Sequence, residues 1–172
     1  MSRIFIKDNF FSEKELNTIK QEMTEVEYVV PPKEKMKQFE GSYWHSHHLP
    51  DVCKLKTLIQ KLVLKNFFYK TNPKEHECVY TMVGASDRPR PHLDKCTAQC
   101  LIYIIGDEKL NNGTGFYKTN KEGSFDLHTH IGFKENRAIF FTAKDNMHSP
   151  LHWAEKDNTS WRYSICNFFD KI

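Results

Sequence analysis

The sequence predicts an α+β fold that is mainly β. Two segments in the first 70 residues carry apolar side chains at helical spacing, whereas the apolar runs from residue 76 onward are short, rich in β-branched and aromatic residues, and bounded by turns. Two helices are too few for a parallel α/β sheet, so we expect a sandwich or barrel packed on helices. The 172 residues show no internal repeat and no linker, which predicts a single domain, helical over about 1–75 and a barrel over about 76–170.

A short strand and an amphipathic helix come first. Residues 4–6 are apolar and predict the strand. Ser12 and Glu15 form a capping-box pattern ahead of apolar residues spaced by three and four. The helical stripe consists of Leu16, Ile19, Met23 and Val26. A pair of prolines at 31–32 stops helical structure, and 33–49 is expected to be loop with a short strand.

The second helix is expected to open at Pro50 and Asp51 and to continue to about Phe67. Its apolar stripe consists of Val52, Leu55, Leu58, Ile59, Leu62 and Val63. From there the pattern changes to that of strands, each bounded by turn residues. The predicted strands cover residues 79–83, 98–105, 115–117, 136–142 and 160–169.

Composition and charge exclude several classes of protein. With 39% hydrophobic and 27% charged residues the chain is neither collagen-like nor strongly disordered. A formal net charge of +3 is too weak to favour a nucleic-acid partner, and no apolar stretch reaches the length of a membrane span. The first residues lack a signal-peptide core, and five cysteines are an odd number. We therefore expect reduced thiols and a cytoplasmic protein that binds no membrane.

The unusual count is nine histidines, which directs attention to metal or acid–base chemistry. His92 and Asp94 lie two residues apart, so on a strand their side chains face the same side. His148, which follows the apolar strand 138–142 after a short turn, is the leading candidate for a third ligand. Two histidines and one carboxylate bind Fe(II) on one face and leave the opposite positions open.

Further residues fit an anionic cosubstrate. Arg162 would offer a planar, always charged fork suited to the distal end of a dicarboxylate. Ser164 faces the same side two residues later and would add a hydrogen bond. Tyr103 lies on a predicted strand soon after the His–Asp pair.

At this point the sequence resembles the Fe(II)/2-oxoglutarate-dependent dioxygenases, in particular their prolyl-hydroxylase-like branch. The resemblance spans most of the chain and is firmest over residues 80–169. The segments that carry it, in order, are His92-Leu-Asp94, Leu101-Ile-Tyr103-Ile, Gly113-Thr-Gly-Phe116, Asn136-Arg-Ala-Ile-Phe-Phe141, His148 and Arg162-Tyr-Ser164.

The resemblance implies a double-stranded β-helix, a jelly-roll or cupin-like barrel with N-terminal helices packed on its major sheet. It implies Fe(II) held by His92, Asp94 and His148, and 2-oxoglutarate whose 5-carboxylate pairs with Arg162, helped by Tyr103 or Ser164. Oxygen would be the second cosubstrate and ascorbate a supporting reductant. The products would be succinate, CO2 and a hydroxylated substrate, and the intact carboxylate at position 94 favours hydroxylation over halogenation.

The sequence departs from the family pattern in three places. Residues 86–91 are Pro-rich and lack the aromatic residue often found there, so the contact to the 1-carboxylate of 2-oxoglutarate is unassigned. Asn112 stands where the family often has a first Gly. His152, four residues after His148, is a rival third ligand; the distance from Phe141 favours His148.

Two alternative functions stay open. One is a cupin-like metal protein with a different reaction, against which Arg162 argues. The other is a catalytically inactive binding module on the same barrel, against which the complete ligand set argues. For the oxygenase, a protein side chain, an amino acid or a small metabolite is the favoured substrate class.

Overall fold

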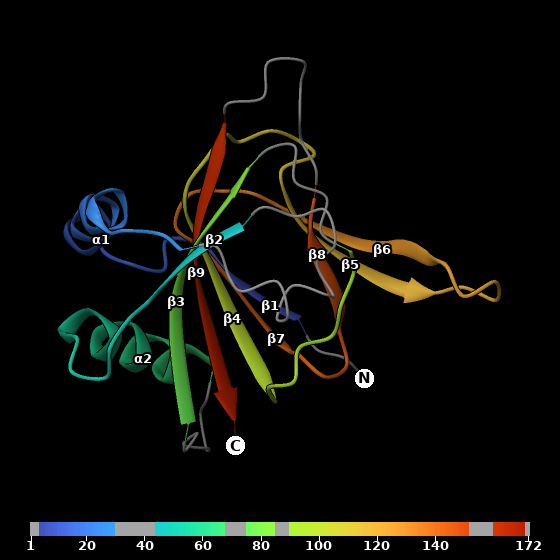
Figure 1. Cartoon of the computed structure of the whole chain (residues 1–172), viewed down its shortest axis with the longest axis horizontal. Coiled ribbons are helices and arrows are strands. Elements are labelled where there is room, and N and C mark those ends of the chain that lie inside the picture. Colours follow the sequence, from blue (N-terminus) through green and yellow to red (C-terminus); the bar gives the residue numbers. More distant parts are fainter. Residues whose placement is uncertain (1–3, 30–43, 68–74, 85–89, 152–159, 171–172) are drawn as a thin grey trace.

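The computed structural model describes residues 4–29, 44–67, 75–84, 90–151 and 160–170 and confirms a mainly β fold with two helices (Figure 1). The helices are α1 (Glu13–Glu25) and α2 (Lys54–Phe67). A six-stranded antiparallel sheet has the order β1-β7-β4-β9-β3-β2, and a three-stranded one has the order β6-β5-β8. The strands are β1 (Ile4–Lys7), β2 (Trp44–His48), β3 (Glu75–Gly84), β4 (Ala98–Ile105), β5 (Gly113–Thr119), β6 (Phe125–Gly132), β7 (Arg137–Thr142), β8 (Met147–Pro150) and β9 (Trp161–Asp170).

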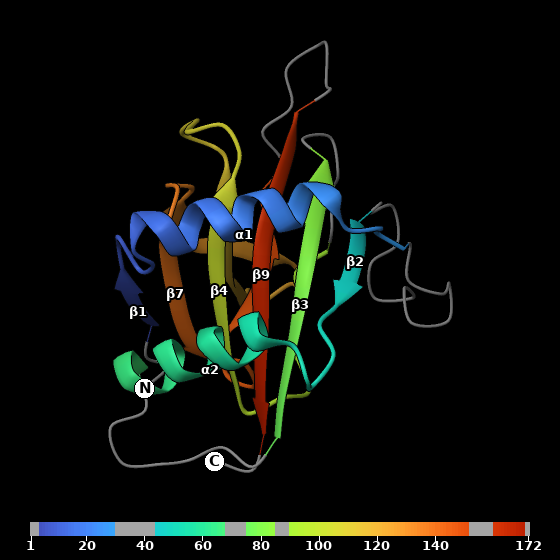
Figure 2. The ribbon, with the colours of Figure 1, turned by 90° about the vertical axis from the view of Figure 1, so that its left-hand side faces the viewer.

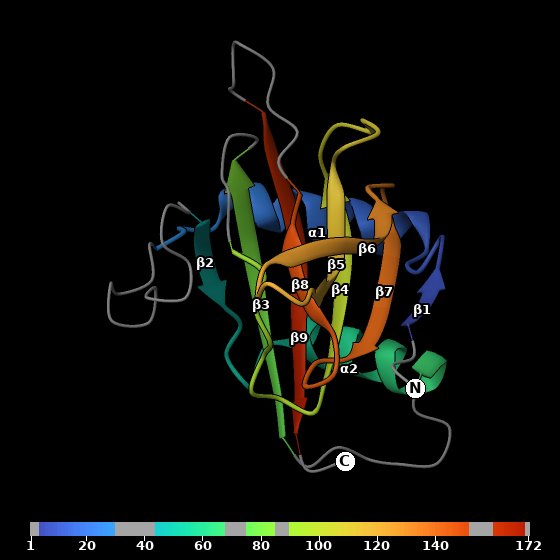
Figure 3. The ribbon, with the colours of Figure 1, turned by 90° about the vertical axis from the view of Figure 1, so that its right-hand side faces the viewer.

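The large sheet lies between the two helices and the small sheet. Both helices cross one of its faces (Figure 2), and β5, β6 and β8 lie against the other (Figure 3). Along β4 the side chains alternate between these layers: Cys100 and Ile102 pack with the helices, whereas Leu101 and Tyr103 pack toward the small sheet. Burial on both faces explains why this strand is apolar almost throughout.

Helix α1 begins as predicted. Ser12 is its N-cap, with the Ser12 amide donating to Glu15 Oε2 at 2.8 Å and the Glu15 amide donating to Ser12 Oγ at 3.4 Å. Ile19 and Met23, from the predicted stripe, are fully buried against the sheet. Within the described parts of the chain, no helix is long and apolar enough to cross a membrane.

Helix α2 starts later than predicted. The amide of Cys53 donates to the carbonyl of Pro50, which closes a turn ahead of the helix, and the first helical residue is Lys54. Val52 is therefore 91% exposed, and the prediction that it belongs to the apolar stripe was wrong. Ile59 and Val63 are the fully buried members of that stripe.

Two strands were not predicted from the sequence. Strand β6 is mostly exposed, so its side chains lack the alternation that marks a half-buried strand. Strand β8 has only four residues and depends on pairing with β5 rather than on its own composition. His148, expected after a turn, lies on this strand.

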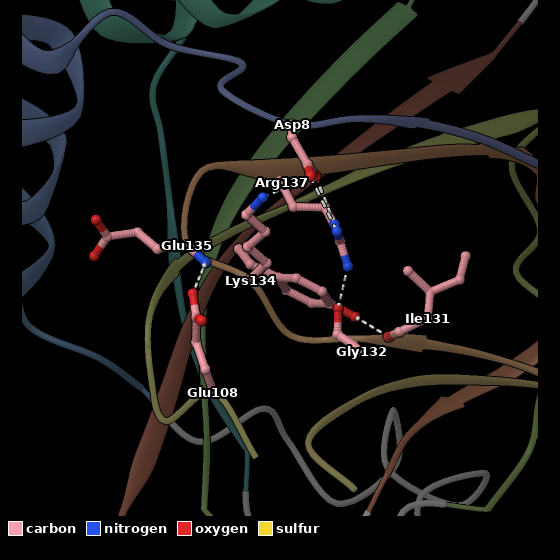
Figure 4. A network of polar contacts seen from close by, with 8 residues as sticks. Asp8, Glu108, Ile131, Gly132, Lys134, Glu135 and Arg137 are labelled. Carbon is pink, nitrogen blue, oxygen red and sulfur yellow. Dashed lines mark hydrogen bonds and ion pairs between the residues drawn. The ribbon is translucent and has the colours of Figure 1, made fainter. Parts of the chain in front are cut away.

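Asn136 anchors the N-terminal segment to the sheets. Its backbone is in the left-handed region, with φ of 61°, and its side-chain amide makes two hydrogen bonds to the backbone of Phe11, at 2.8 and 2.9 Å. Nearby, Asp8 binds the Arg137 guanidinium through both carboxylate oxygens, and Arg137 also donates to the carbonyl of Gly132 (Figure 4). The hydrogen bond from Arg137 holds the pKa of Asp8 well below its usual range.

This anchor predicts a difference between two substitutions of Asn136. Both Asn136→Ala and Asn136→Gly remove the amide, but only alanine also carries a Cβ in the left-handed region, which costs about 1 kcal/mol. The alanine variant should therefore have the lower free energy of unfolding in urea titrations. Equal stability of the two variants would show that the backbone at residue 136 is not constrained in this way.

Candidate metal centre

A pair of backbone hydrogen bonds brings the two predicted histidine ligands together. The amide of His92 donates to the carbonyl of His148 at 3.0 Å, and the amide of His148 donates to the carbonyl of His92 at 2.9 Å. Residues directly opposite each other in an antiparallel pair project their side chains to the same face. The imidazole ring centroids are accordingly 4.7 Å apart although the residues are far apart in sequence.

Each imidazole is oriented by a local backbone carbonyl. Nδ1 of His92 lies 3.0 Å from the carbonyl oxygen of Arg90, and Nδ1 of His148 lies 3.0 Å from that of Asn146. A carbonyl can only accept, so Nδ1 carries a proton in both rings, and in the neutral form of each imidazole Nε2 then presents a lone pair. This is the tautomer in which a histidine binds a metal through Nε2.

Asp94 completes the cluster. Its Oδ1 is 3.7 Å from Nε2 of His92, and its Oδ2 is 3.4 Å from Nε2 of His148. One potential ligand atom from each of the three residues lies within 4.8 Å of the others, which is the only such group among the described residues. The predicted i, i+2 relation of His92 and Asp94 therefore places their side chains as expected.

Burial and the contacts within the cluster both shift the pKa values of His92 and Asp94. Burial, together with the neighbouring His148, lowers the pKa of His92, which favours the neutral imidazole. Burial alone would raise the pKa of Asp94, but the close approach of His148 and His92 outweighs it and lowers that pKa. Neutral imidazoles and an ionised carboxylate are the forms that bind a divalent metal.

Aromatic packing fixes the His148 ring. Phe141 of β7 meets it edge-on, with centroids 4.8 Å apart, and Phe116 of β5 lies 6.2 Å away. The His148 side chain is only 7% exposed. A ring held in this way loses little conformational freedom when it binds a ligand.

A narrow cavity connects the cluster with the predicted cosubstrate residues. It lies between the two sheets, and its walls combine apolar and polar side chains. The lining residues are Thr81, Val83, His92, Asp94, Gln99, Leu101, Thr114, His148, Pro150, Arg162, Ser164, Cys166 and Phe168. A second, wider pocket shares Asp94 and Phe168 with it, and so reaches the cluster from another side.

Arg162 is the buried cation of this cavity. It is 2% exposed, and burial lowers the pKa of its guanidinium, which still stays charged near neutrality because arginine is so strongly basic. Its Nη1 donates to the carbonyl of Gly113 at 2.5 Å and to Oδ1 of Asn112 at 3.2 Å. The guanidinium carbon also lies 5.4 Å from the centroid of the Tyr103 ring.

Ser164 and Tyr103, the two other predicted cosubstrate residues, differ in their surroundings. Oγ of Ser164 is buried in the cavity wall with no hydrogen-bond partner among the described residues. The Tyr103 hydroxyl is 2.6 Å from Oγ1 of Thr114, and it also donates to the carbonyl of Ile131 at 3.4 Å. Thr114, and not Tyr103, lines the cavity, so Tyr103 lies one layer behind its wall.

Some of these residues were missed by the sequence reasoning. Thr114 and Gln99 line the cavity, and Asn112 contacts Arg162, but none of the three stood out as a site residue. The one sequence signal for any of the three was Asn112, which stands where the family that the sequence resembles often has a Gly. His152, the rival third ligand, lies outside the described residues.

No family model and no curated protein matches this sequence. Solved structures do match it. A prolyl-4-hydroxylase of Pseudomonas putida has a TM-score of 0.68 at 10% identity, covering 100% of this chain and 94% of its own. HygX of Streptomyces hygroscopicus, with nickel, 2-oxoglutarate and hygromycin B bound, has a TM-score of 0.63 at 10% identity, with 99% and 84% covered. A 2OG-Fe(II) oxygenase family oxidoreductase of Burkholderia pseudomallei has a TM-score of 0.65 at 11% identity, with 99% and 86% covered.

The chain has the fold of the 2-oxoglutarate- and Fe(II)-dependent oxygenases. This confirms the mainly β fold with two helices and antiparallel sheets, and it is consistent with the double-stranded β-helix that the resemblance implied. The sequence identity to these structures is only 10% or 11%. Roles of individual residues rest on their geometry in this chain.

The cluster predicts how metal binding responds to loss of one histidine. His148→Ala should abolish stoichiometric Ni(II) binding measured by calorimetry, because two ligands remain where three converge. His152→Ala should leave the affinity unchanged. The reverse pattern would assign the third ligand to His152.

Proposed function

We propose that this protein is an Fe(II)- and 2-oxoglutarate-dependent oxygenase that hydroxylates its substrate and releases succinate and CO2. One observation carries the proposal. The cavity that holds His92, Asp94 and His148 is also lined by a buried arginine and a serine whose hydroxyl has no partner among the described residues. A metal centre and a carboxylate site in one cavity fit a cosubstrate that binds at both of its ends.

The three residues fit iron by their donor set. Two imidazole nitrogens and one carboxylate oxygen form the set that binds Fe(II) on one face and leaves positions open. His92, Asp94 and His148 would hold the metal, and the carbonyls of Arg90 and Asn146 would keep the imidazoles in the ligating tautomer. When bound, iron supplies the activation of oxygen that couples decarboxylation of 2-oxoglutarate to hydroxylation.

The opposite part of the cavity suits the far carboxylate of 2-oxoglutarate. Arg162 would donate to this carboxylate and Ser164 would add a hydroxyl donor, which satisfies an Oγ that otherwise lacks a partner in the described structure. Leu101, Val83 and Phe168 add apolar surface to the walls of the cavity. Such walls exclude water and strengthen the pairing of the carboxylate with Arg162.

The arrangement of the sheets supports a double-stranded β-helix. The six-stranded and three-stranded sheets face each other, and the His92–His148 bridge adds the segment around His92 to the small sheet beside β8. We propose that residues 1–172 form one oxygenase domain of this kind. Coverage of 94% of the Pseudomonas putida enzyme by this chain agrees with that proposal.

The wider pocket beside Asp94 is the proposed path of the substrate. It meets the cavity at Asp94 and Phe168, so a C–H bond entering there would approach the metal while 2-oxoglutarate occupies the Arg162 side. The similar structures include a prolyl hydroxylase and a protein with hygromycin B bound. Protein side chains, amino acids and small metabolites therefore all belong in a substrate panel.

The reaction predicts succinate. Aerobic incubation with Fe(II), 2-oxoglutarate and ascorbate should release succinate at a low rate alone and faster with the correct substrate. Asp94→Ala should abolish this release, whereas Asp145→Ala, which changes an exposed aspartate, should not. Absence of succinate across the whole panel would favour a cupin-like protein of different activity or an inactive binding module.

The proposed site for the far carboxylate predicts that Ser164 contributes to the affinity for 2-oxoglutarate. Ser164→Ala removes one hydroxyl donor to a charged group, which is worth about 1.5 kcal/mol and corresponds to roughly a tenfold rise in the Kd of 2-oxoglutarate. Calorimetry on the Ni(II)-loaded protein measures it, with the exposed Ser124→Ala as a matched control. An unchanged Kd in Ser164→Ala would move the far carboxylate away from this residue.

A further inference from the structure

Asn112 lies outside the cavity wall but directly behind Arg162. It immediately precedes β5 and is completely buried, with 0% exposure. Its backbone is tied at both ends, because its amide donates to the carbonyl of Lys109 at 3.0 Å and its carbonyl accepts from the amide of Phe133 at 2.7 Å. The position of its side chain is therefore set by the backbone around it.

The orientation of the Asn112 amide is fixed as well. Its Nδ2 donates to the carbonyl of Asp107 at 2.7 Å, and a carbonyl cannot be paired with the amide oxygen. Oδ1 must then face the other way, where it accepts from Nη1 of Arg162 at 3.2 Å. The same Nη1 donates to the carbonyl of Gly113 at 2.5 Å.

These contacts constrain the guanidinium in two ways. Two acceptors on Nη1 fix the direction of the guanidinium within its own plane. The Tyr103 ring, whose centroid lies 5.4 Å from the guanidinium carbon, restricts the tilt of that plane. Asn112, Gly113 and Tyr103 contact it through groups that are uncharged, so these contacts hold the cation without cancelling its charge. A carboxylate at position 112 would pair with Arg162 and compete with an incoming anion.

We propose that Asn112 is a positioning residue that holds Arg162 in the direction required to bind the distal carboxylate of 2-oxoglutarate. The inference rests on the proposed function and assigns a task to one of the residues at which this sequence departs from the family that it resembles. Asn112 acts through Arg162 and touches no cosubstrate. Its loss therefore weakens the binding of 2-oxo acids that carry a distal carboxylate and spares those that lack one.

The test compares two 2-oxo acids on the Ni(II)-loaded protein by calorimetry. 2-Oxoglutarate has a distal carboxylate, whereas 2-oxobutyrate presents the same chelating end and a plain methyl terminus. Asn112→Ala should raise the Kd of 2-oxoglutarate about tenfold, the usual loss for a hydrogen bond to a charged group, and change that of 2-oxobutyrate less than about twofold. Asn111→Ala, at the neighbouring exposed asparagine, should leave both constants unchanged.

A milder variant covers the case in which Asn112→Ala does not fold. Asn112→Ser keeps a polar oxygen and should give a smaller loss for 2-oxoglutarate, again with 2-oxobutyrate spared. Equal losses for both acids would mean a purely structural role, and no loss would mean that Arg162 is held without Asn112; either result overturns the inference. Failure of the unaltered protein to bind 2-oxoglutarate at all would instead overturn the proposed function, and the inference with it.

Discussion

The two backbone hydrogen bonds between His92 and His148 are the constraint on which the candidate centre depends. They join to β8 a segment that has no other strand pairing among the residues that the structure describes, and β8 is itself paired with β5. Because the two residues are directly opposed, their imidazoles point into the same space between the sheets. Asp94, two residues from His92, then needs only an extended backbone to reach both rings.

The two sheets together form the cavity around the paired histidines, and the helices lie on the far face of the larger sheet. The helices cover one face of the six-stranded sheet, which leaves its other face to form the cavity with the small sheet. Strand β9 crosses the cavity, with Arg162 and Ser164 toward one end and Phe168 toward Asp94. This strand of ten residues thus links the candidate metal ligands with the buried guanidinium of Arg162. The candidate metal ligands and the Arg162 cation therefore share one cavity, whose walls combine polar and apolar side chains.

Much of this could be predicted from the sequence because the relevant signals are local. The capping box at Ser12, the apolar strand 98–105 and the i, i+2 relation of His92 and Asp94 depend on neighbouring residues only. The start of α2 could not be predicted, because residues 50–53 form a hydrogen-bonded turn and the helix begins only after it. Strands β6 and β8 could not be predicted because their conformation comes from pairing with β5 and leaves no periodic pattern. The hydrogen bond between Asn112 and Arg162 joins residues 50 positions apart, which no local pattern reveals.

The most direct test is a crystal structure of the protein with Ni(II) and 2-oxoglutarate. We expect the metal to be bound by Nε2 of His92, Nε2 of His148 and the carboxylate of Asp94, with the chelating end of 2-oxoglutarate on the same ion. The far carboxylate should lie against Arg162 and Ser164. A metal held by another set of residues, or a far carboxylate directed away from Arg162, would contradict the proposed site.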